Sequence, residues 1–98
     1  MAITSKQRAQ LRALANPIDT VLMVGKGGIS PELIRTADEA ITARELIKGK
    51  VLEACELSSR EAADEIGAAI NADVVQVIGS KFVLYRRNKK EPKIKLVK

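Results

Sequence analysis

The amino-acid sequence predicts an α/β protein with the element order α-β-α-β-α-β-β and a mixed four-stranded sheet. Three observations predict it: helical apolar spacing alternates with short apolar runs, glycine or proline marks the boundaries, and a two-residue turn joins the last two strands. Strand-helix-strand units imply parallel neighbours joined by right-handed crossovers, whereas the final hairpin adds an antiparallel strand. A chain of 98 residues has room for one domain.

The first two elements are predicted from a cap and an apolar run. Thr4 and Gln7 have the spacing of a capping box for a helix over residues 6–15. Asn16-Pro17 ends this helix, because proline disfavours helical geometry in the residue before it. Residues 20–24 form a short, unbroken apolar run, which indicates a strand covered on both faces.

A second helix and strand follow a glycine-rich turn. Ser30 caps a helix that runs to about Ala43, and Pro31 occupies the first position, where a missing N–H costs nothing. Residues 45–53 alternate with the period of a strand, so their side chains divide between two faces. One face carries Ile47, Gly49 and Val51, and the other carries Lys48 and Lys50.

The last elements are a helix, a hairpin and a tail. Ser58 and Glu61 form a capping box for a third helix. Its inward positions are Ala62, Ala63, Ile66 and Ile70. Residues 74–78 and 81–87 are predicted strands, because Gly79-Ser80 between them is a hairpin turn with glycine first. The end of the chain is polar and basic, so we expect a domain over residues 1–88 and an extended tail over residues 89–98.

Positive charge is concentrated at one end of the chain. The net charge is +5, yet residues 1–80 carry nine Lys and Arg against eleven Asp and Glu. Residues 81–98 carry eight Lys and Arg against one Glu. One part of the surface is therefore expected to be acidic and another basic, which suits a protein that docks on nucleic acid in one orientation. A solubilising tail would have the same composition, and charge alone does not choose between the two.

The composition excludes several kinds of functional site. Without histidine the chain lacks the commonest general base and metal ligand. The lone Cys55 offers neither an internal disulfide nor a cysteine-rich metal site, and its acidic neighbours disfavour a reactive thiolate. We expect no enzyme activity, no cofactor or metal, and no small-molecule substrate. The lone cysteine, the lack of a signal-peptide pattern and the short apolar runs favour a cytoplasmic protein that does not contact membranes.

Gly25-Lys26-Gly27-Gly28 stands out because it joins a predicted strand to a predicted helix. Glycines let backbone N–H groups approach a phosphate with no Cβ in the way, the helix N-terminus adds partial positive charge, and Lys26 adds a full charge. The Gly-x-x-Gly pattern clamps the RNA backbone in KH domains. It matches neither a mononucleotide P-loop nor a dinucleotide fingerprint. A turn that merely reverses the chain is the commoner role of such glycines, so the context decides.

Basic side chains elsewhere extend the candidate site. Lys48 and Lys50 are expected where a sheet face is open, because burying two unpaired lysines would cost much free energy. The aromatic residues, Phe82 and Tyr85, fall on opposite faces of one strand, so base stacking is not supported and phosphate contacts should dominate. The candidate RNA-binding residues are Gly25, Lys26, Gly27, Gly28, Lys48, Lys50, Arg86, Lys89 and Lys90.

Four segments, in their order and spacing, resemble the stand-alone bacterial form of the YhbY-like CRM domain (chloroplast RNA splicing and ribosome maturation). They are residues 11–17, 24–29 and 45–48, and the closing hairpin made by residues 75–79 and 83–86. The resemblance implies a fold related to the C-terminal domain of a bacterial translation initiation factor. It also implies RNA binding through Gly25 and Gly28 and association with precursors of the large ribosomal subunit. Gly49 departs from the pattern, where a β-branched residue is expected; it either weakens the strand or admits a close neighbour.

The leading hypothesis is a factor without enzyme activity that binds ribosomal RNA, or precursor particles of the large subunit, during assembly. Ribosomal proteins are further candidate partners. The alternative is a protein–protein interaction module whose acidic third helix recruits an assembly partner through Glu61, Asp64 and Glu65. The spacing of these carboxylates is also typical of an ordinary solvated helix face. Charge changes at Lys26 or on the third helix distinguish the two hypotheses.

Overall fold

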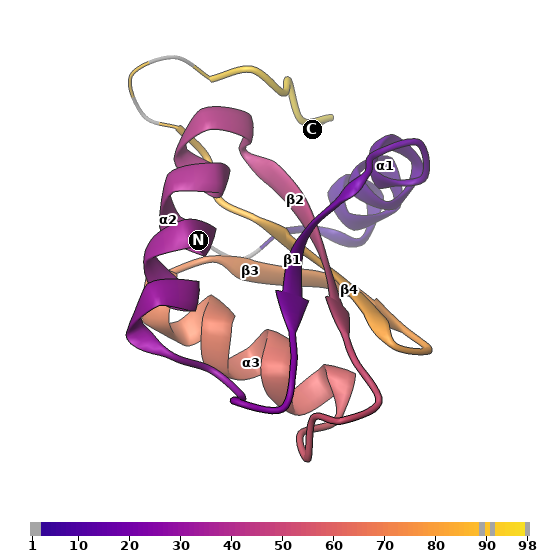
Figure 1. Cartoon of the computed structure of the whole chain (residues 1–98). Helices are drawn as coiled ribbons and strands as arrows, with labels where there is room; N and C mark the ends of the chain where they lie inside the picture. The colour runs from indigo at the N-terminus through magenta and orange to yellow at the C-terminus, as the bar shows by residue number, and fades with distance from the viewer. Residues whose placement is uncertain (1–2, 89, 91, 98) are drawn as a thin grey trace.

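The computed structural model describes residues 3–88, 90 and 92–97, and its elements follow the predicted order (Figure 1). They are α1 (Ser5–Ala15), β1 (Thr20–Val24), α2 (Pro31–Arg44), β2 (Leu46–Val51), α3 (Ser59–Ile70), β3 (Asp73–Ile78) and β4 (Lys81–Tyr85). The predicted caps of all three helices form, with Thr4, Ser30 and Ser58 each accepting a hydrogen bond from a backbone N–H in the first turn. The fold class is therefore confirmed.

The sheet has the strand order β1-β2-β4-β3. β1 and β2 are parallel, whereas β4 runs antiparallel to both β2 and β3. The expectation that β2 and β3 are parallel neighbours is wrong, because β4 lies between them. Residues 82–85 of β4 are all buried, so this strand is covered on both faces and paired along both edges. β3 is left at the edge, where the side chain of Ile78 is 63% exposed.

Apolar side chains pack on both faces of the sheet. The larger cluster joins α2 and α3 to one face, through residues that include Ile41, Ile66, Ile47, Phe82 and Leu84. The smaller cluster lies on the other face beneath α1 and comprises Leu11, Ala15, Leu46, Val75, Val83 and Tyr85. Phe82 and Tyr85 therefore lie on opposite faces, as predicted. The helices take opposite sides of the sheet, with α1 apart from α2 and α3 (Figure 1).

The hairpin between β3 and β4 has the predicted two-residue turn. Ile78 pairs with Lys81, so Gly79 and Ser80 form the connection. Gly79 has φ 57°, and the turn requires a residue with positive φ at this position. The strand β4 ends at Tyr85, two residues earlier than predicted. Arg86 still donates its backbone N–H to the carbonyl of Glu45 at 2.9 Å, but its side chain turns away towards α2.

Glu45 joins α2 to β2 and is fully buried. Its backbone has φ 65°, and its N–H donates to the carbonyl of Ile41 at 2.8 Å. Its carboxylate accepts hydrogen bonds from three backbone N–H groups that follow β4. The donors are Asn88 at 2.8 Å, Ile94 at 2.7 Å, and Lys93. A buried carboxylate is stable only with such partners, so the helix-to-strand junction and the chain after β4 are structurally coupled.

The chain after β4 folds back onto the sheet. Its described residues form neither helix nor strand. Ile94 and Leu96 pack against the smaller cluster. From α1, Gln7 donates a hydrogen bond to the carbonyl of Val97, and Gln10 accepts one from the N–H of Val97. The tail therefore covers part of the face that α1 also covers. Lys89, Glu91 and Lys98 of the predicted tail lie outside the described residues.

Gly49 provides the space that the ring of Phe82 occupies. The two residues face each other across β2 and β4. A Cβ added at Gly49 would lie under 3.0 Å from three atoms of the Phe82 ring. The departure from a β-branched residue at this position is therefore explained by a close neighbour.

We predict that Gly49→Ala lowers the free energy of unfolding by about 1–3 kcal/mol, because the added methyl group overpacks the core against a rigid ring. In an open strand the same change would stabilise the protein. Urea unfolding measures the effect, and Phe82→Leu supplies the matched background. Gly49→Ala should cost much less once the ring is removed. An equal cost in both backgrounds would show that the ring is not the cause.

We predict that Glu45→Ala lowers the free energy of unfolding by about 2 kcal/mol or more, because three backbone N–H groups lose their buried acceptor. Urea unfolding and the rate of tryptic cleavage at Lys93 and Lys95 measure the loss and the release of the tail. Glu39→Ala is the control, since Glu39 is an exposed glutamate of α2. Its effect should stay within about 0.5 kcal/mol. Equal stability of the two variants would contradict the structural role of Glu45.

Candidate nucleic-acid interface

The Gly25–Gly28 loop is a tight turn at the end of β1. The N–H of Gly28 donates to the carbonyl of Gly25 at 2.9 Å, and Gly28 has φ 68°. This φ favours glycine, so the turn itself explains Gly28. It does not explain the others: a Cβ at Gly27 would meet nothing within 4 Å, and one at Gly25 would make an ordinary 3.7 Å contact with Leu52. The fold has room for side chains at both positions.

The tip of the loop offers backbone donors and one cation. Lys26 and Gly27 are exposed, and within the described residues their N–H groups have no protein acceptor. Exposed glycine-rich backbone with a lysine at the tip is suited to binding a phosphate group. The N-terminus of α2 contributes less to anion binding than the sequence suggested. Pro31 lacks an N–H, Ser30 already accepts from Leu33 at 3.1 Å, and Glu32 places a carboxylate in the first turn.

Lys48 and Lys50 lie on the face of β2 that points towards α1. Lys48 pairs with Val83, which belongs to the cluster beneath α1, and Lys50 pairs with Lys81. Both lysines are partly exposed, and Nζ of Lys48 donates to the carbonyl of Asn16 at 3.4 Å. The sheet face is therefore open at this point, as predicted.

The glycine loop and these lysines share one end of the sheet. Val24 pairs with Val51 at the ends of β1 and β2, and the N–H of Leu52 donates to the carbonyl of Val24 at 2.9 Å. The loop begins directly after Val24. Lys50 lies one residue before Val51. The structure thus brings the two predicted groups of residues to neighbouring positions.

Arg86 lies at the opposite end of the sheet. Leu46 pairs with Tyr85 at the start of β2, so Arg86 is separated from the loop by the length of that strand. Its guanidinium donates to Asp38 at 2.6 Å, to the carbonyl of Ile70 at 2.7 Å and to Thr42 at 2.6 Å. These contacts connect β4 to both α2 and α3. The side chain of Arg86 therefore has a structural role, and the structure does not bring it together with Lys26 or Lys50.

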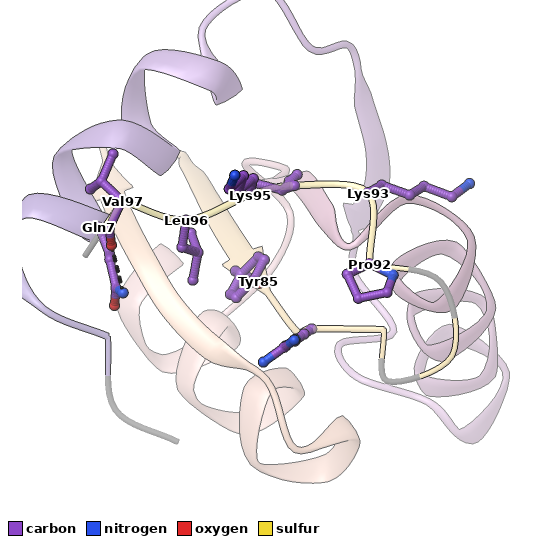
Figure 2. Close-up of a pocket in the computed structure, with 9 residues that line it drawn as sticks. Gln7, Tyr85, Pro92, Lys93, Lys95, Leu96 and Val97 are labelled. Atoms are coloured by element: carbon purple, nitrogen blue, oxygen red, sulfur yellow. Dashed lines mark hydrogen bonds between the residues drawn. The ribbon is translucent and has the colours of Figure 1, made fainter.

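The tail encloses a hollow of about 530 Å³ over Tyr85 (Figure 2). Its cationic lining residues are Arg87, Lys93 and Lys95, and Nε2 of Gln7 donates to the carbonyl of Val97 at 2.9 Å. Tyr85 is 2% exposed, so its ring is not available for stacking on a base. Its buried hydroxyl has no partner among the described residues. Lys90 is exposed, whereas Lys89 lies outside the described residues.

The acidic face of α3 is partly engaged in its own helix. The Glu61 carboxylate accepts from the N–H of Ser58 at 3.1 Å, and Asp64 lies 3.9 Å from Arg60.

Cys55 is a free thiol packed against the larger cluster. In the described part of the chain no group of three or more potential metal ligands occurs. None of the helices in that part is long and apolar enough to cross a membrane.

The model of the CRS1/YhbY (CRM) domain family matches residues 3–86. The chain belongs to this family. The match runs from the residue before the cap of α1 to the residue after β4, so it includes the Gly25–Gly28 loop, β2 and the open sheet face.

Relatives of this CRM protein are named for RNA binding. The probable RNA-binding protein YqeI of Bacillus subtilis is 37% identical over 94 residues, which is 96% of this chain and 98% of YqeI. The probable RNA-binding protein PA4753 of Pseudomonas aeruginosa is 32% identical, over 95% of this chain and 89% of PA4753. The solution structure of SAV1595 from Staphylococcus aureus has a TM-score of 0.82 and 40% identity, and covers 98% of this chain and 100% of its own.

One basic residue beside the candidate interface is absent from the residues predicted from sequence. Lys81 is exposed and lies directly across from Lys50. Its position at the start of a predicted strand was visible in the sequence. The face to which it points was not, because this depends on the pairing of β4 with β2.

We predict that Tyr85→Phe leaves the RNA affinity of this CRM protein unchanged and raises the free energy of unfolding by up to about 1 kcal/mol. The change removes a buried hydroxyl that has no partner. Titration of labelled RNA and urea unfolding test the two statements. A large loss of RNA affinity with intact stability would instead indicate that the ring contacts RNA.

The same variant tests a pH dependence. Burial, and next the negative charge of Glu45, raise the pKa of Tyr85 above its ordinary value of 10.0. The phenol of the unfolded chain therefore ionises at lower pH than the phenol of the folded protein. The free energy of unfolding is unaffected by this ionisation below about pH 10 and falls as the pH rises further. Tyr85→Phe should lose less stability than the wild type over that alkaline range. Parallel losses in the two proteins would contradict this assignment.

Proposed function

We propose that this CRM protein binds ribosomal RNA, without catalysing a reaction, and acts in the cytoplasm on precursors of the large ribosomal subunit during their assembly. The Gly25–Gly28 loop holds RNA phosphates, and Lys48 and Lys50 hold the adjoining backbone. Lys89 and Lys90 of the basic tail, beyond the domain over residues 1–88, widen the contact. Ribosomal proteins are further candidate partners. The resemblance to stand-alone bacterial CRM proteins supports the ribosomal part of the proposal.

The observation that carries the proposal is the glycine content of the loop. Gly28 is needed for the turn, but the fold would accept a side chain at Gly25 and Gly27. Glycine at positions with free space is explained if another molecule approaches the backbone there. The exposed N–H groups and the Lys26 cation are matched to a phosphate. The names of the relatives support RNA as the source of that phosphate.

We predict that Lys26→Asp weakens RNA binding across many sequences alike, because a phosphate contact carries no base information. The slope of log affinity against log salt should fall by about 0.7–0.9 for the lost contact. Titration of labelled ribosomal RNA fragments at several salt concentrations measures both. Lys6→Asp, the same charge change at the exposed start of α1, is the matched control.

Gly25→Ala separates the loop backbone from the lysine. The added methyl group is tolerated by the fold at 3.7 Å from Leu52, so stability should hold while RNA affinity falls. A changed sequence preference with intact affinity for Lys26→Asp would contradict the phosphate clamp.

Sedimentation of tagged protein in a low-salt lysate gradient tests the ribosomal part. Wild type should travel with precursors of the large subunit, whereas Lys26→Asp should remain near the top. Wild type at the top of the gradient would remove the support for an assembly role. Loss of co-sedimentation on charge reversal at Glu65, with Lys26→Asp behaving as wild type, would favour the acidic α3 as a docking surface instead.

A further inference from the structure

A row of four side chains crosses the sheet beside the glycine loop. Met23 pairs with Lys50, Lys50 with Lys81, and Lys81 with Ile78, so the row runs from β1 to β3. Directly paired residues project from the same face of a sheet. This face is the one that α1 covers further along, because Lys48 and Val83 form the adjacent pair.

The row is not covered by α1. Met23 is 60% exposed and Ile78 is 63% exposed, while Lys81 is exposed and Lys50 partly so. The apolar contacts of α1 lie at the other end of the same face, around Leu46, Val83 and Tyr85. An uncovered end of the sheet therefore adjoins the Gly25–Gly28 loop.

The two central lysines repel each other in the isolated protein. Like charges directly opposite in a sheet are destabilising, and Lys48 adds a third cation two residues from Lys50. Within the described residues, the ion pairs are Arg60–Asp64 and Arg86–Asp38, so no carboxylate neutralises these lysines. A polyanion on this face would relieve the repulsion.

The row leads to an arginine-lined hollow of about 560 Å³ along the free edge of β3. Arg8 of α1 donates to the carbonyls of Val74 and Val75 at 2.6 and 2.9 Å, so these two acceptors of β3 are already bonded within the protein. Arg12 of α1 and Arg60 of α3 line the same hollow and are exposed. Among the described residues, Arg60 has only the weak, solvent-exposed ion pair with Asp64, so it remains available to an anion.

We propose that a single strand of RNA crosses the uncovered end of the sheet, from the glycine loop over Lys50 and Lys81 to the hollow at Arg12 and Arg60. This inference rests on the proposed function and adds a direction and a second anchor to it. The path spans three strand spacings, or roughly 14 Å, before it reaches the edge of β3. That length brings successive phosphates over the row, and the hollow binds the backbone beyond them.

The apolar ends of the row favour an unpaired strand. Met23 and Ile78 flank the two lysines, and their exposed side chains can pack against base faces. Only unpaired nucleotides present those faces, since a duplex buries them in its own stack. A duplex would contact the lysines but leave both apolar side chains in water.

The test is titration of a fluorescent single-stranded oligouridylate of about twelve nucleotides, within the range that single-strand-binding folds occupy. Lys81→Glu and Arg12→Glu are each expected to weaken binding about tenfold and to lower the salt slope by about 0.7. Arg35→Glu makes the same change on the exposed face of α2 and should bind as wild type does. A matched RNA duplex should compete poorly for the wild type.

Two results would overturn the path. Wild-type affinity in both Lys81→Glu and Arg12→Glu, with Lys26→Asp still impaired, would show that RNA binds the loop and does not cross the sheet. Equal competition by the duplex would show that the face does not select a single strand. Both results leave the proposed function intact, whereas a wild type that binds neither oligouridylate nor ribosomal RNA fragments would overturn the proposed function itself.

Discussion

The burial of β4 on both of its faces is the constraint on which the rest of the structure depends. Phe82 and Leu84 enter the cluster under α2 and α3, while Val83 and Tyr85 enter the cluster under α1. A strand buried in this way must be paired along both edges, because its backbone groups have no water to bond. β4 therefore lies between β2 and β3. The glycine loop, the last residue of β2 and the hairpin turn come to the same end of the sheet.

The second constraint is the buried carboxylate of Glu45. It binds the backbone after β4, so the tail returns over the face that α1 only partly covers. α1 and the tail together enclose one end of this face and leave the other end open. The open end is where Lys50 and Lys81 lie, next to Lys26 and the loop. The position of α1 and the tail on this face therefore determines both which apolar residues are buried and which lysines are exposed.

This arrangement divides the basic residues into groups with different roles. Arg86 and Arg8 bond carbonyls or carboxylates of the protein and hold its elements together. Lys26, Lys50 and Lys81 have no ion-pair partner among the described residues. Net charge therefore overstates the number of cations available to a polyanion. Lys50 and Lys81 lie side by side at one end of one sheet face, with Lys26 in the adjoining loop. This local group of cations favours one orientation of a nucleic acid that binds there.

The sequence by itself determined the elements, because caps, turn residues and apolar spacing act over a few neighbouring residues. It also indicated the glycine loop and the open position of Lys48 and Lys50, since unpaired lysines avoid burial. It misplaced β3 beside β2, and it indicated neither the structural contacts of Arg86 nor the position of Lys81 across from Lys50. Only the tertiary structure decided these points. Strand order depends on which strand is buried from both sides. Asp38, which pairs with Arg86, and Lys50, which lies across from Lys81, are each more than 30 residues away in the chain. Such contacts leave no local pattern, because they are set by the packing of whole elements.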